Sequence, residues 1–299
     1  MALTFEDEGR ILAKITDGKY KNKIIAVVSE EKGNTFKSLT IKEGKFQQCP
    51  DPNTERQILY ITGASGSGKS TYTSKYTILY KKIFPKNPIY VFSALKDDAS
   101  LDVIKPKRFK ITQEALIDDP INIEDLSNSL CIFDDIDCIS KKELKEAVYN
   151  ILNEILETGR HFRISCIITN HLPSNGVYTR RILNECHSIT YFPHSGNNGK
   201  LKKFLIDQIG LDKQDFINNK KAKSRWATIF KNYPMVNMTE TTINLLGDED
   251  DEEEIPKERK GGAKIKDLLS KYTKDEILNL LETEEPNKLE NKKLLKKVH

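Results

Sequence analysis

The fold is decided by the stretch Gly63-Ala64-Ser65-Gly66-Ser67-Gly68-Lys69-Ser70, which fills every fixed position of the phosphate-binding loop template, the Walker A motif. This stretch follows a strand-like apolar run, Gln57-Ile58-Leu59-Tyr60-Ile61, and precedes residues 71–82, which are compatible with a helix. Closely spaced glycines allow the backbone to form a nest whose N–H groups point at phosphate oxygens. Because of the strand before it and the helix after it, the stretch predicts a nucleotide-binding loop rather than a flexible turn.

Two side chains of this loop have predicted roles. Lys69 supplies a movable positive charge for the β and γ phosphates, and the Ser70 hydroxyl holds Mg²⁺. The expected cofactors are therefore ATP and Mg²⁺. The predicted nucleotide contacts are Gly63, Ala64, Ser65, Gly66, Ser67, Gly68, Lys69, Ser70 and Thr71.

The composition indicates a globular protein. The chain has 299 residues, 31% charged and 37% hydrophobic, enough for one large core with appendages or for two modest domains. Its longest apolar runs, such as residues 130–133, are too short to cross a bilayer, and residues 1–8 do not resemble a secretory signal. We expect no membrane partner and an intracellular location, in the host cytoplasm or in the virion if the source is viral.

The five cysteines do not predict a disulfide framework or a metal site. Their number is odd and their spacing is not that of metal ligands. Two of them, Cys131 and Cys166, fall in predicted buried strands, where cysteine behaves as a small hydrophobe.

The chain divides into three expected regions. Residues 1–52 form a small β element with strands at 11–15, 24–28 and 38–41. Residues 53–246 form the nucleotide domain, and residues 247–299 form an acidic linker and a helical, partly disordered tail. The tail is solvated, contacts nucleic acid, or is a docking segment for a protein partner.

Within residues 53–246, strands and helices alternate, which predicts an α/β fold with a parallel sheet and helices on both faces. The expected strands are residues 58–61, 89–92, 130–133, 164–169 and 188–192, with a helix at 141–158. Residues 225–231 and 235–238 are expected as strands that close or edge the sheet.

The second informative site is Leu130-Cys131-Ile132-Phe133-Asp134-Asp135, an apolar strand that ends in two acids. In a Walker B strand the first acid supports the Mg²⁺ ion, which assigns that role to Asp134. Asp135 then lies where a general base orients water toward the γ-phosphate. Asp137 is expected to be a helix cap or a surface residue. Taken alone, two acids at a strand end also fit an ordinary turn.

The third site is the apolar strand Ile164-Ser165-Cys166-Ile167-Ile168-Thr169-Asn170-His171. The Asn170 amide is expected to act as a sensor, because it can hydrogen-bond both the attacking water and the γ-phosphate. The alternative is a turn-forming asparagine before Leu172-Pro173. His171 is expected to be a secondary polar contact without a catalytic role.

Multimeric NTPases often supply an arginine to a neighbouring subunit's γ-phosphate. Two places in the chain qualify: Arg160, which precedes the fourth strand, and the pair Arg180-Arg181, which leads into the fifth. The alternative is that these arginines are only solvated.

These motifs together resemble the genome-packaging ATPases of poxviruses and other large DNA viruses, in the FtsK/HerA division of P-loop ATPases. The resemblance covers about residues 56–238 and rests on the loop at 63–70, Phe133-Asp134-Asp135, and Gly159-Arg160-His161 leading into Ile164-Ser165. It implies the additional-strand (51432-type) topology, with the Asp134 and Asn170 strands inside the sheet and the Asn170 strand beside the loop strand. Packaging ATPases commonly have glutamine where this chain has Asn170, which favours a broader AAA-like interpretation.

The resemblance implies an oligomeric ATPase motor that moves double-stranded DNA through a ring of identical subunits. Lysines at 200–203 and 220–223 are candidates for phosphate contacts, or equally are solubilising faces of short helices. Two alternatives remain open: a nucleotide-gated AAA-like switch or scaffold with low turnover, and a nucleotide or nucleoside kinase, which shares the loop.

Overall fold

The computed structural model describes residues 1–6, 8–29, 35–118, 120–195 and 198–247. The predictions for the tail from residue 248 onward lie outside the described residues. Within the described part, no helix is both long and apolar enough to cross a membrane.

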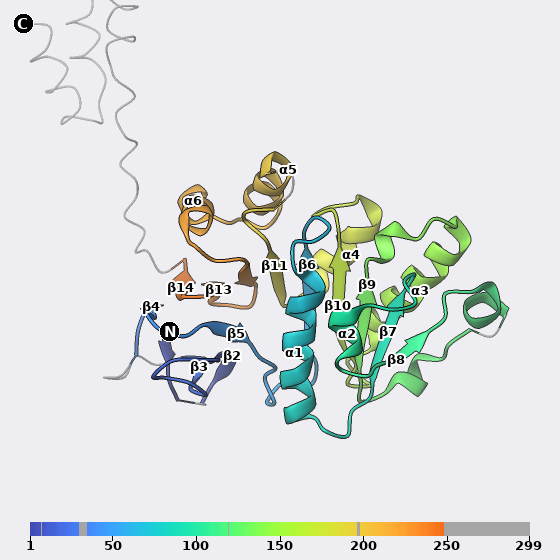
Figure 1. Cartoon of the computed structure of the whole chain (residues 1–299), viewed down its shortest axis with the longest axis horizontal. Helices are drawn as coiled ribbons and strands as arrows, with labels where there is room; N and C mark the ends of the chain where they lie inside the picture. Colours follow the sequence, from blue (N-terminus) through green and yellow to red (C-terminus); the bar gives the residue numbers. More distant parts are fainter. Residues whose placement is uncertain (7, 30–34, 119, 196–197, 248–299) are drawn as a thin grey trace, which may run out of the picture. The chain divides into compact units, whose positions relative to one another are not determined.

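The amino-terminal residues form a small antiparallel sheet with strand order β1-β3-β2-β5 (Figure 1). Its strands are β1 (Ala2–Thr4), β3 (Ile24–Val28), β2 (Arg10–Ile15) and β5 (Phe46–Gln48). The expected strand at 38–41 is β4 (Ser38–Thr40), and it pairs with β14 (Thr242–Leu246) of the larger sheet. The amino-terminal β element is thus tied by backbone hydrogen bonds to the last strand before residue 248.

The larger sheet has ten strands in the order β4-β14-β13-β12-β11-β6-β10-β9-β7-β8. Its centre is parallel and consists of β11 (Ser188–Tyr191), β6 (Ile58–Thr62), β10 (Ser165–Asn170), β9 (Leu130–Asp134) and β7 (Ile89–Ser93). Numbered along the chain, these five strands lie in the order 5-1-4-3-2, so the expected additional-strand topology is confirmed. The sheet extends beyond this centre through β8 (Lys107–Phe109), β12 (Ala227–Phe230), β13 (Met235–Thr239) and β14.

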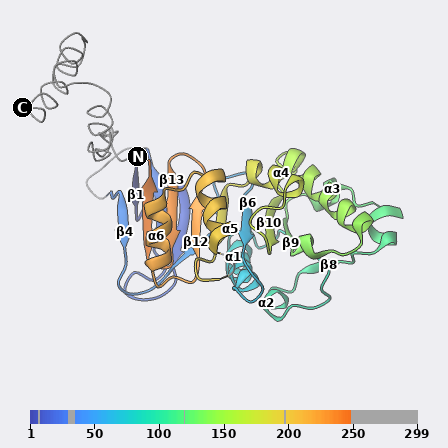
Figure 2. The ribbon, with the colours of Figure 1, turned by 90° about the horizontal axis from the view of Figure 1, so that it is seen from above.

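Helices cover both faces of the central strands (Figure 2). One face carries α1 (Lys69–Ile83) and α2 (Ala99–Asp102), and the other carries α3 (Lys142–Thr158) and α4 (Val177–Glu185). The remaining helical segments are η1 (Glu114–Asp118), η2 (Ile123–Leu126), η3 (Ile136–Cys138), α5 (Asn198–Lys203), η4 (Phe204–Gln208) and α6 (Lys213–Lys221).

The side chains of each central strand contribute alternately to two apolar cores, because successive side chains of a strand point to opposite faces of the sheet. In β9, Cys131 and Phe133 belong to the core beneath α3, whereas Leu130 and Ile132 belong to the core beneath α1. All four are buried, which explains why a central parallel strand is apolar at every position. This alternation also decides which face each polar residue at a strand end occupies.

The two covering helices use different apolar stripes. The buried side of α1 carries Tyr72, Tyr76 and Tyr80, spaced four residues apart so that they share one face. In α3 the buried stripe runs from Val148 to Leu156, and the helix ends at Thr158, with Gly159 as its C-cap. Both helices are thus fixed against the sheet by side chains at helical spacing.

Candidate nucleotide-binding site

The predicted phosphate-binding loop connects β6 to α1 at the carboxyl edge of the parallel strands. Gly66 and Gly68 have φ angles of +74° and +109°, which glycine adopts without steric cost. A Cβ atom on Gly63 would lie 2.6 Å from the Ser67 Oγ and 2.7 Å from the Phe192 ring. The glycines therefore allow the loop both to turn sharply and to pack on Phe192.

Lys69 lies at the start of α1 with only 5% of its surface exposed. Its Nζ donates a hydrogen bond to the Gly63 carbonyl at 3.0 Å and lies 3.4 Å from the Asp135 Oδ1. The loop and the end of β9, more than sixty residues apart in sequence, therefore meet at this amine. Such a contact is what the Walker A and Walker B assignments predict.

The register of the sheet brings three polar side chains together at the same edge. Asp134 of β9 is aligned with Ser93 of β7 on one side and with Thr169 of β10 on the other. The Ser93 hydroxyl donates to the Asp134 Oδ2 at 3.3 Å, and the Thr169 Oγ1 lies 3.0 Å from the Asp134 Oδ1. Neither Ser93 nor Thr169 is among the predicted site residues, although Thr169 ends the expected strand at 164–169 and Ser93 directly follows the expected strand at 89–92.

One threonine proton serves two carboxylates at this point. The Thr169 Oγ1 lies 3.1 Å from the Asp135 Oδ1 as well, while it accepts a hydrogen bond from the Asp135 backbone N–H at 2.9 Å. A hydroxyl has a single donor proton, so it satisfies only one of the two acids at a time. The site is therefore rich in negative charge and poor in donors.

This arrangement disfavours the charged form of the Asp134 carboxyl group. Its surface is 2% exposed, and burial first, then the neighbouring Asp135 charge, raises the pKa of the Asp134 carboxyl above its usual range. Lys69 pairs with Asp135 and not with Asp134. A second cation at Asp134 would relieve both effects.

The donor set at this edge fits Mg²⁺. Carboxylate and hydroxyl oxygens are its preferred ligands, and Asp134 and Ser70 offer one of each. Ser70 lies in the first turn of α1, half-buried. The buried Ser67 hydroxyl has no hydrogen-bond partner among the described residues, which matches a loop shaped for an additional acceptor such as phosphate.

The Asn170 side chain lies on the other face of the sheet from Asp134. It is fully buried, its Nδ2 donates to the Tyr60 hydroxyl at 3.4 Å, and its Oδ1 has no partner among the described residues. The sensor role of Asn170 stays a prediction. The polar group of β10 that contacts the two acids is the Thr169 hydroxyl.

Asp137 is not the helix cap or surface residue expected from the sequence. The residue at the cap of η3 is Asp135, which has a left-handed backbone with φ of 47°. The Asp137 side chain is only 4% exposed and accepts a hydrogen bond from the His171 backbone N–H at 3.1 Å. The chain after β9 therefore turns back toward the end of β10.

The three candidate trans arginines lie away from this cluster. Arg160 precedes β10, at the sheet edge opposite to the loop, and forms an ion pair with Glu55. Arg181 of α4 lies 3.1 Å from the Glu157 carboxylate, and Arg180 is exposed on the same helix. Among the other predicted contacts, Thr71 and Ser65 are exposed and Ala64 is half-buried.

A cavity of about 490 Å³ adjoins the phosphate-binding loop at Gly66 and Ser67. Gly66, Ser67 and Phe192 form the wall next to the loop. The opposite wall consists of His194, Ser195 and residues 221–225, which include two lysines and an arginine. The cavity combines one aromatic ring with several positive charges, beside the predicted phosphate site.

No protein-family model matches the chain. The uncharacterized protein V3 of Sputnik virophage is 45% identical over 235 residues, which cover 78% of this chain and 94% of V3.

Solved structures similar to the chain include the genome packaging NTPase B204 of Sulfolobus turreted icosahedral virus 2 in complex with AMPPCP. The identity is 13% and the TM-score 0.44, covering 63% of this chain and 98% of B204. Another is the pCW3 conjugation coupling protein TcpA with ATPgS, with 13% identity, a TM-score of 0.43 and coverage of 77% of each chain.

Proposed function

The chain belongs to the family of the V3 protein of Sputnik virophage, and we propose that it is a Mg²⁺-dependent P-loop ATPase, acting as an oligomeric motor on double-stranded DNA. The observation that carries the proposal is the contact of the Lys69 amine with both the loop carbonyl of Gly63 and the Asp135 carboxylate. A loop that merely turns has no need of a buried lysine paired with an acid from a distant strand.

In this proposal the triphosphate lies against the loop at 63–70. Backbone N–H groups of the loop bind the phosphates, and Lys69 approaches the β and γ oxygens. Asp134 and the Ser70 hydroxyl would hold Mg²⁺, whose charge offsets the phosphates and the buried carboxylate. Ser93 and Thr169 keep the Asp134 carboxylate oriented through their hydroxyl groups.

Asp135 is the proposed general base. Its Oδ1 lies beside Lys69, so it stands next to the position of the γ-phosphate. It would accept a proton from the attacking water while the bond between the γ-phosphorus and the bridging oxygen breaks and ADP leaves. The Thr169 hydroxyl, which contacts both acids, is the proposed relay between the metal ligand and the base.

The cavity beside Gly66, Ser67 and Phe192 is the proposed place of the base and ribose. Its opposite wall includes Lys221, Lys223 and Arg225, so positive charge would face the nucleotide from the end of α6 and the segment that follows it. Residues 222–225 follow α6 in the chain, and the helices α5 and α6, both of which carry exposed lysines, lie near each other in both views (Figures 1 and 2).

Those lysines support the DNA part of the proposal. Lys202 and Lys203 of α5 and Lys220 and Lys221 of α6 are exposed, and sequence-independent phosphate contacts need only such charges. Because the same segment reaches the nucleotide cavity, ATP turnover and DNA contact are coupled in this proposal through residues 221–225.

The test measures ATP hydrolysis of the full chain with and without double-stranded DNA, together with the mass of the protein in ATP. We expect Mg²⁺-dependent hydrolysis, stimulation by DNA, and self-association. Lys69→Ala should lower turnover by about 10²–10³-fold, the effect of removing one electrostatic stabiliser. Lys75→Ala, an exposed lysine on the same helix, is the matched control.

Three outcomes would overturn parts of this proposal. Tight ATP binding with negligible hydrolysis would indicate a nucleotide-gated switch. Transfer of phosphate to a nucleoside or nucleotide would indicate a kinase. A monomer whose hydrolysis ignores DNA would leave an ATPase that is not a DNA motor.

A further inference from the structure

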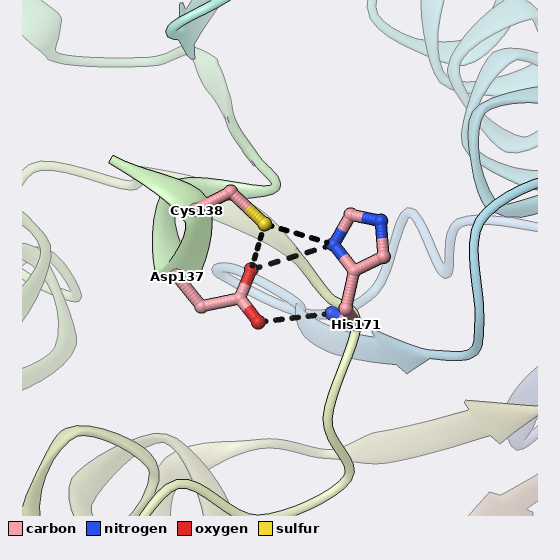
Figure 3. A group of neighbouring side chains, drawn as sticks. All are labelled: Asp137, Cys138 and His171. Carbon is pink, nitrogen blue, oxygen red and sulfur yellow. Dashed lines mark hydrogen bonds and ion pairs between the residues drawn. The ribbon is translucent and has the colours of Figure 1, made fainter. Parts of the chain in front are cut away.

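Three potential metal ligands meet beside the nucleotide site (Figure 3). Asp137 and Cys138 end η3, directly after β9, and His171 follows β10. The His171 Nδ1 lies 3.2 Å from the Cys138 Sγ and 3.7 Å from the Asp137 Oδ1, and the Sγ lies 3.7 Å from that same oxygen. All three atoms therefore face one point.

These separations are those of ligands around one tetrahedral ion. Zinc lies about 2.3 Å from sulfur and about 2.0–2.2 Å from nitrogen or oxygen, which places tetrahedral ligands about 3.3–3.6 Å apart. Each of the three observed distances departs from that range by only a few tenths of an ångström. Two of the three distances involve the exposed Cys138, so a rotamer change of that side chain would adjust both.

The donor set indicates which metal the cluster suits. Magnesium and calcium take oxygen ligands, whereas a thiolate with an imidazole and a carboxylate favours Zn²⁺ among the common divalent ions. The chemistry thus differs from that at Asp134 and Ser70. Two sites with distinct metal preference are placed side by side at this sheet edge.

The cluster is held in position before any ion binds. The His171 backbone N–H donates to the Asp137 Oδ2, which leaves the Oδ1 facing the imidazole and the thiol. Within the described residues, no lysine or arginine forms an ion pair with the Asp137 side chain, although that side chain is 4% exposed. The Lys145 Nζ donates to the Asp137 backbone carbonyl at 2.6 Å and not to the side chain, so a cation bound at the Oδ1 would supply the counter-charge of the carboxylate itself.

An ion can also reach the cluster. Cys138 is exposed, and the His171 side chain is 29% exposed. The third ligand is the buried one, so the site is open on the side of the thiol and the ring. Such access leaves the fourth coordination position to water.

We propose that Asp137, Cys138 and His171 form a binding site for one Zn²⁺ ion, distinct from the Mg²⁺ site of the ATPase. The His171 Nδ1 also lies 3.4 Å from the Asp135 Oδ1, so zinc bound at that nitrogen withdraws His171 from the proposed general base. This coupling to turnover rests on the proposed function, whereas zinc binding itself does not.

Little in the sequence points to this site. The ligands come from two segments 33 residues apart, and the cysteine spacing is not that of a zinc motif. Only the register of β9 with β10 brings the two segments together.

The experiment titrates the full chain, without a polyhistidine tag, with Zn²⁺ and separately with Co²⁺. We expect one Zn²⁺ per chain in the presence of excess Mg²⁺, and a sulfur-to-Co²⁺ charge-transfer absorption band that Zn²⁺ abolishes. Cys138→Ser and His171→Gln should each weaken Zn²⁺ binding by at least about 10-fold, the smallest loss usual even for outer partners of metal ligands. His161→Gln, an exposed histidine elsewhere, should bind as the unmodified chain does.

The cobalt band separates this cluster from carboxylate-only sites, because it requires a thiolate ligand. Folding of each variant is checked by its thermal transition and by ATP binding. Unchanged Zn²⁺ affinity in Cys138→Ser, or the absence of the cobalt band in the unmodified chain, would overturn the proposal and leave the three groups as a hydrogen-bonded cluster. ATP turnover is measured separately, so failure of the zinc site leaves the ATPase proposal standing.

Discussion

Replacing Asp134 with asparagine should stabilise the protein and at the same time abolish Mg²⁺-dependent ATP turnover. The carboxylate is 2% exposed and lies beside Asp135, and Lys69 pairs with Asp135 rather than with Asp134. Asparagine removes the buried charge and keeps the geometry. Its Oδ1 can accept from the Thr169 hydroxyl, and its Nδ2 can donate to the Ser93 oxygen, at the positions where the two carboxylate oxygens lie.

The expected gain in stability follows because the substitution removes a buried charge and keeps two hydrogen bonds. Both hydrogen bonds survive, with donor and acceptor exchanged only in the one to Ser93, so the main change is relief of desolvation and of repulsion between two acids. We expect about 1–2 kcal/mol in the free energy of unfolding, the usual yield of one stabilising substitution. For a domain of this size that corresponds to a rise of roughly 2–8 °C in the melting temperature.

The assay is thermal unfolding in EDTA across a range of pH. The pKa of Asp134 is raised in the folded protein, so protons favour the folded state, and the penalty on the unmodified chain grows as pH rises through that raised pKa. The advantage of Asp134→Asn should therefore be full at neutral pH and shrink in acid. Asp97→Asn, an exposed loop residue, is the control. A melting temperature that falls in Asp134→Asn, or a gain independent of pH, would refute the reasoning.

Added Mg²⁺ provides the complementary measurement. It should raise the melting temperature of the unmodified chain in the presence of ATP, because a ligand that binds only the folded state stabilises it. The same addition should do little for Asp134→Asn. Equal Mg²⁺ stabilisation of both proteins would show that Asp134 is not a metal ligand.

Two further predictions concern single side chains. Thr169→Val, which removes the hydroxyl shared by the two acids, should lower turnover by about 10–100-fold with a smaller effect on ATP affinity. The control Thr62→Val, which removes a buried hydroxyl without a partner among the described residues, should leave turnover unchanged. Steady-state kinetics and ATP titration decide between a catalytic and a packing role for Thr169. Burial lowers the pKa of His187 from 6.5 to about 4, and its ring nitrogen accepts from a backbone N–H of β6. Because the folded-state pKa is depressed, stability should fall by at most about 3 kcal/mol as pH drops from 6.5 to 4, and His187→Asn should flatten that decline in urea unfolding.

The centre of the sheet was well predicted from the sequence, because a long apolar run followed by a glycine-rich loop or by paired acids is typical of a buried parallel strand that ends at a site. The strands before Lys69 and Asp134 begin and end within a residue of their expected bounds. Short strands were missed: β5 and β8 have three residues each and carry polar side chains. Their pairing is set by neighbouring strands rather than by local sequence.

The details of the site were harder to predict, since they depend on register. Thr169 and Asn170 are adjacent polar residues, and the sequence favoured the amide as the sensor. In the sheet Thr169 aligns with Asp134, so it faces the acids and α1, whereas Asn170 faces the core beneath α3 and contacts Tyr60. A shift of one residue exchanges the two faces of a strand, and sequence alone does not fix that shift.

The contacts of Lys69 link ATP binding to the contacts of Asp135, the proposed general base. Its amine contacts the Asp135 carboxylate and the Gly63 carbonyl, and triphosphate oxygens compete with both for the same three protons. When Lys69 turns to phosphate, Asp135 keeps the contacts with Thr169 and His171, neither of which carries a permanent charge. The Asp135 Oδ1 is then released from the ammonium group, so in the proposed mechanism it can accept a hydrogen bond from a water molecule instead. In the proposed mechanism, occupancy of the loop therefore frees Asp135 from Lys69, and a zinc ion on His171 would remove one of the two remaining partners of Asp135.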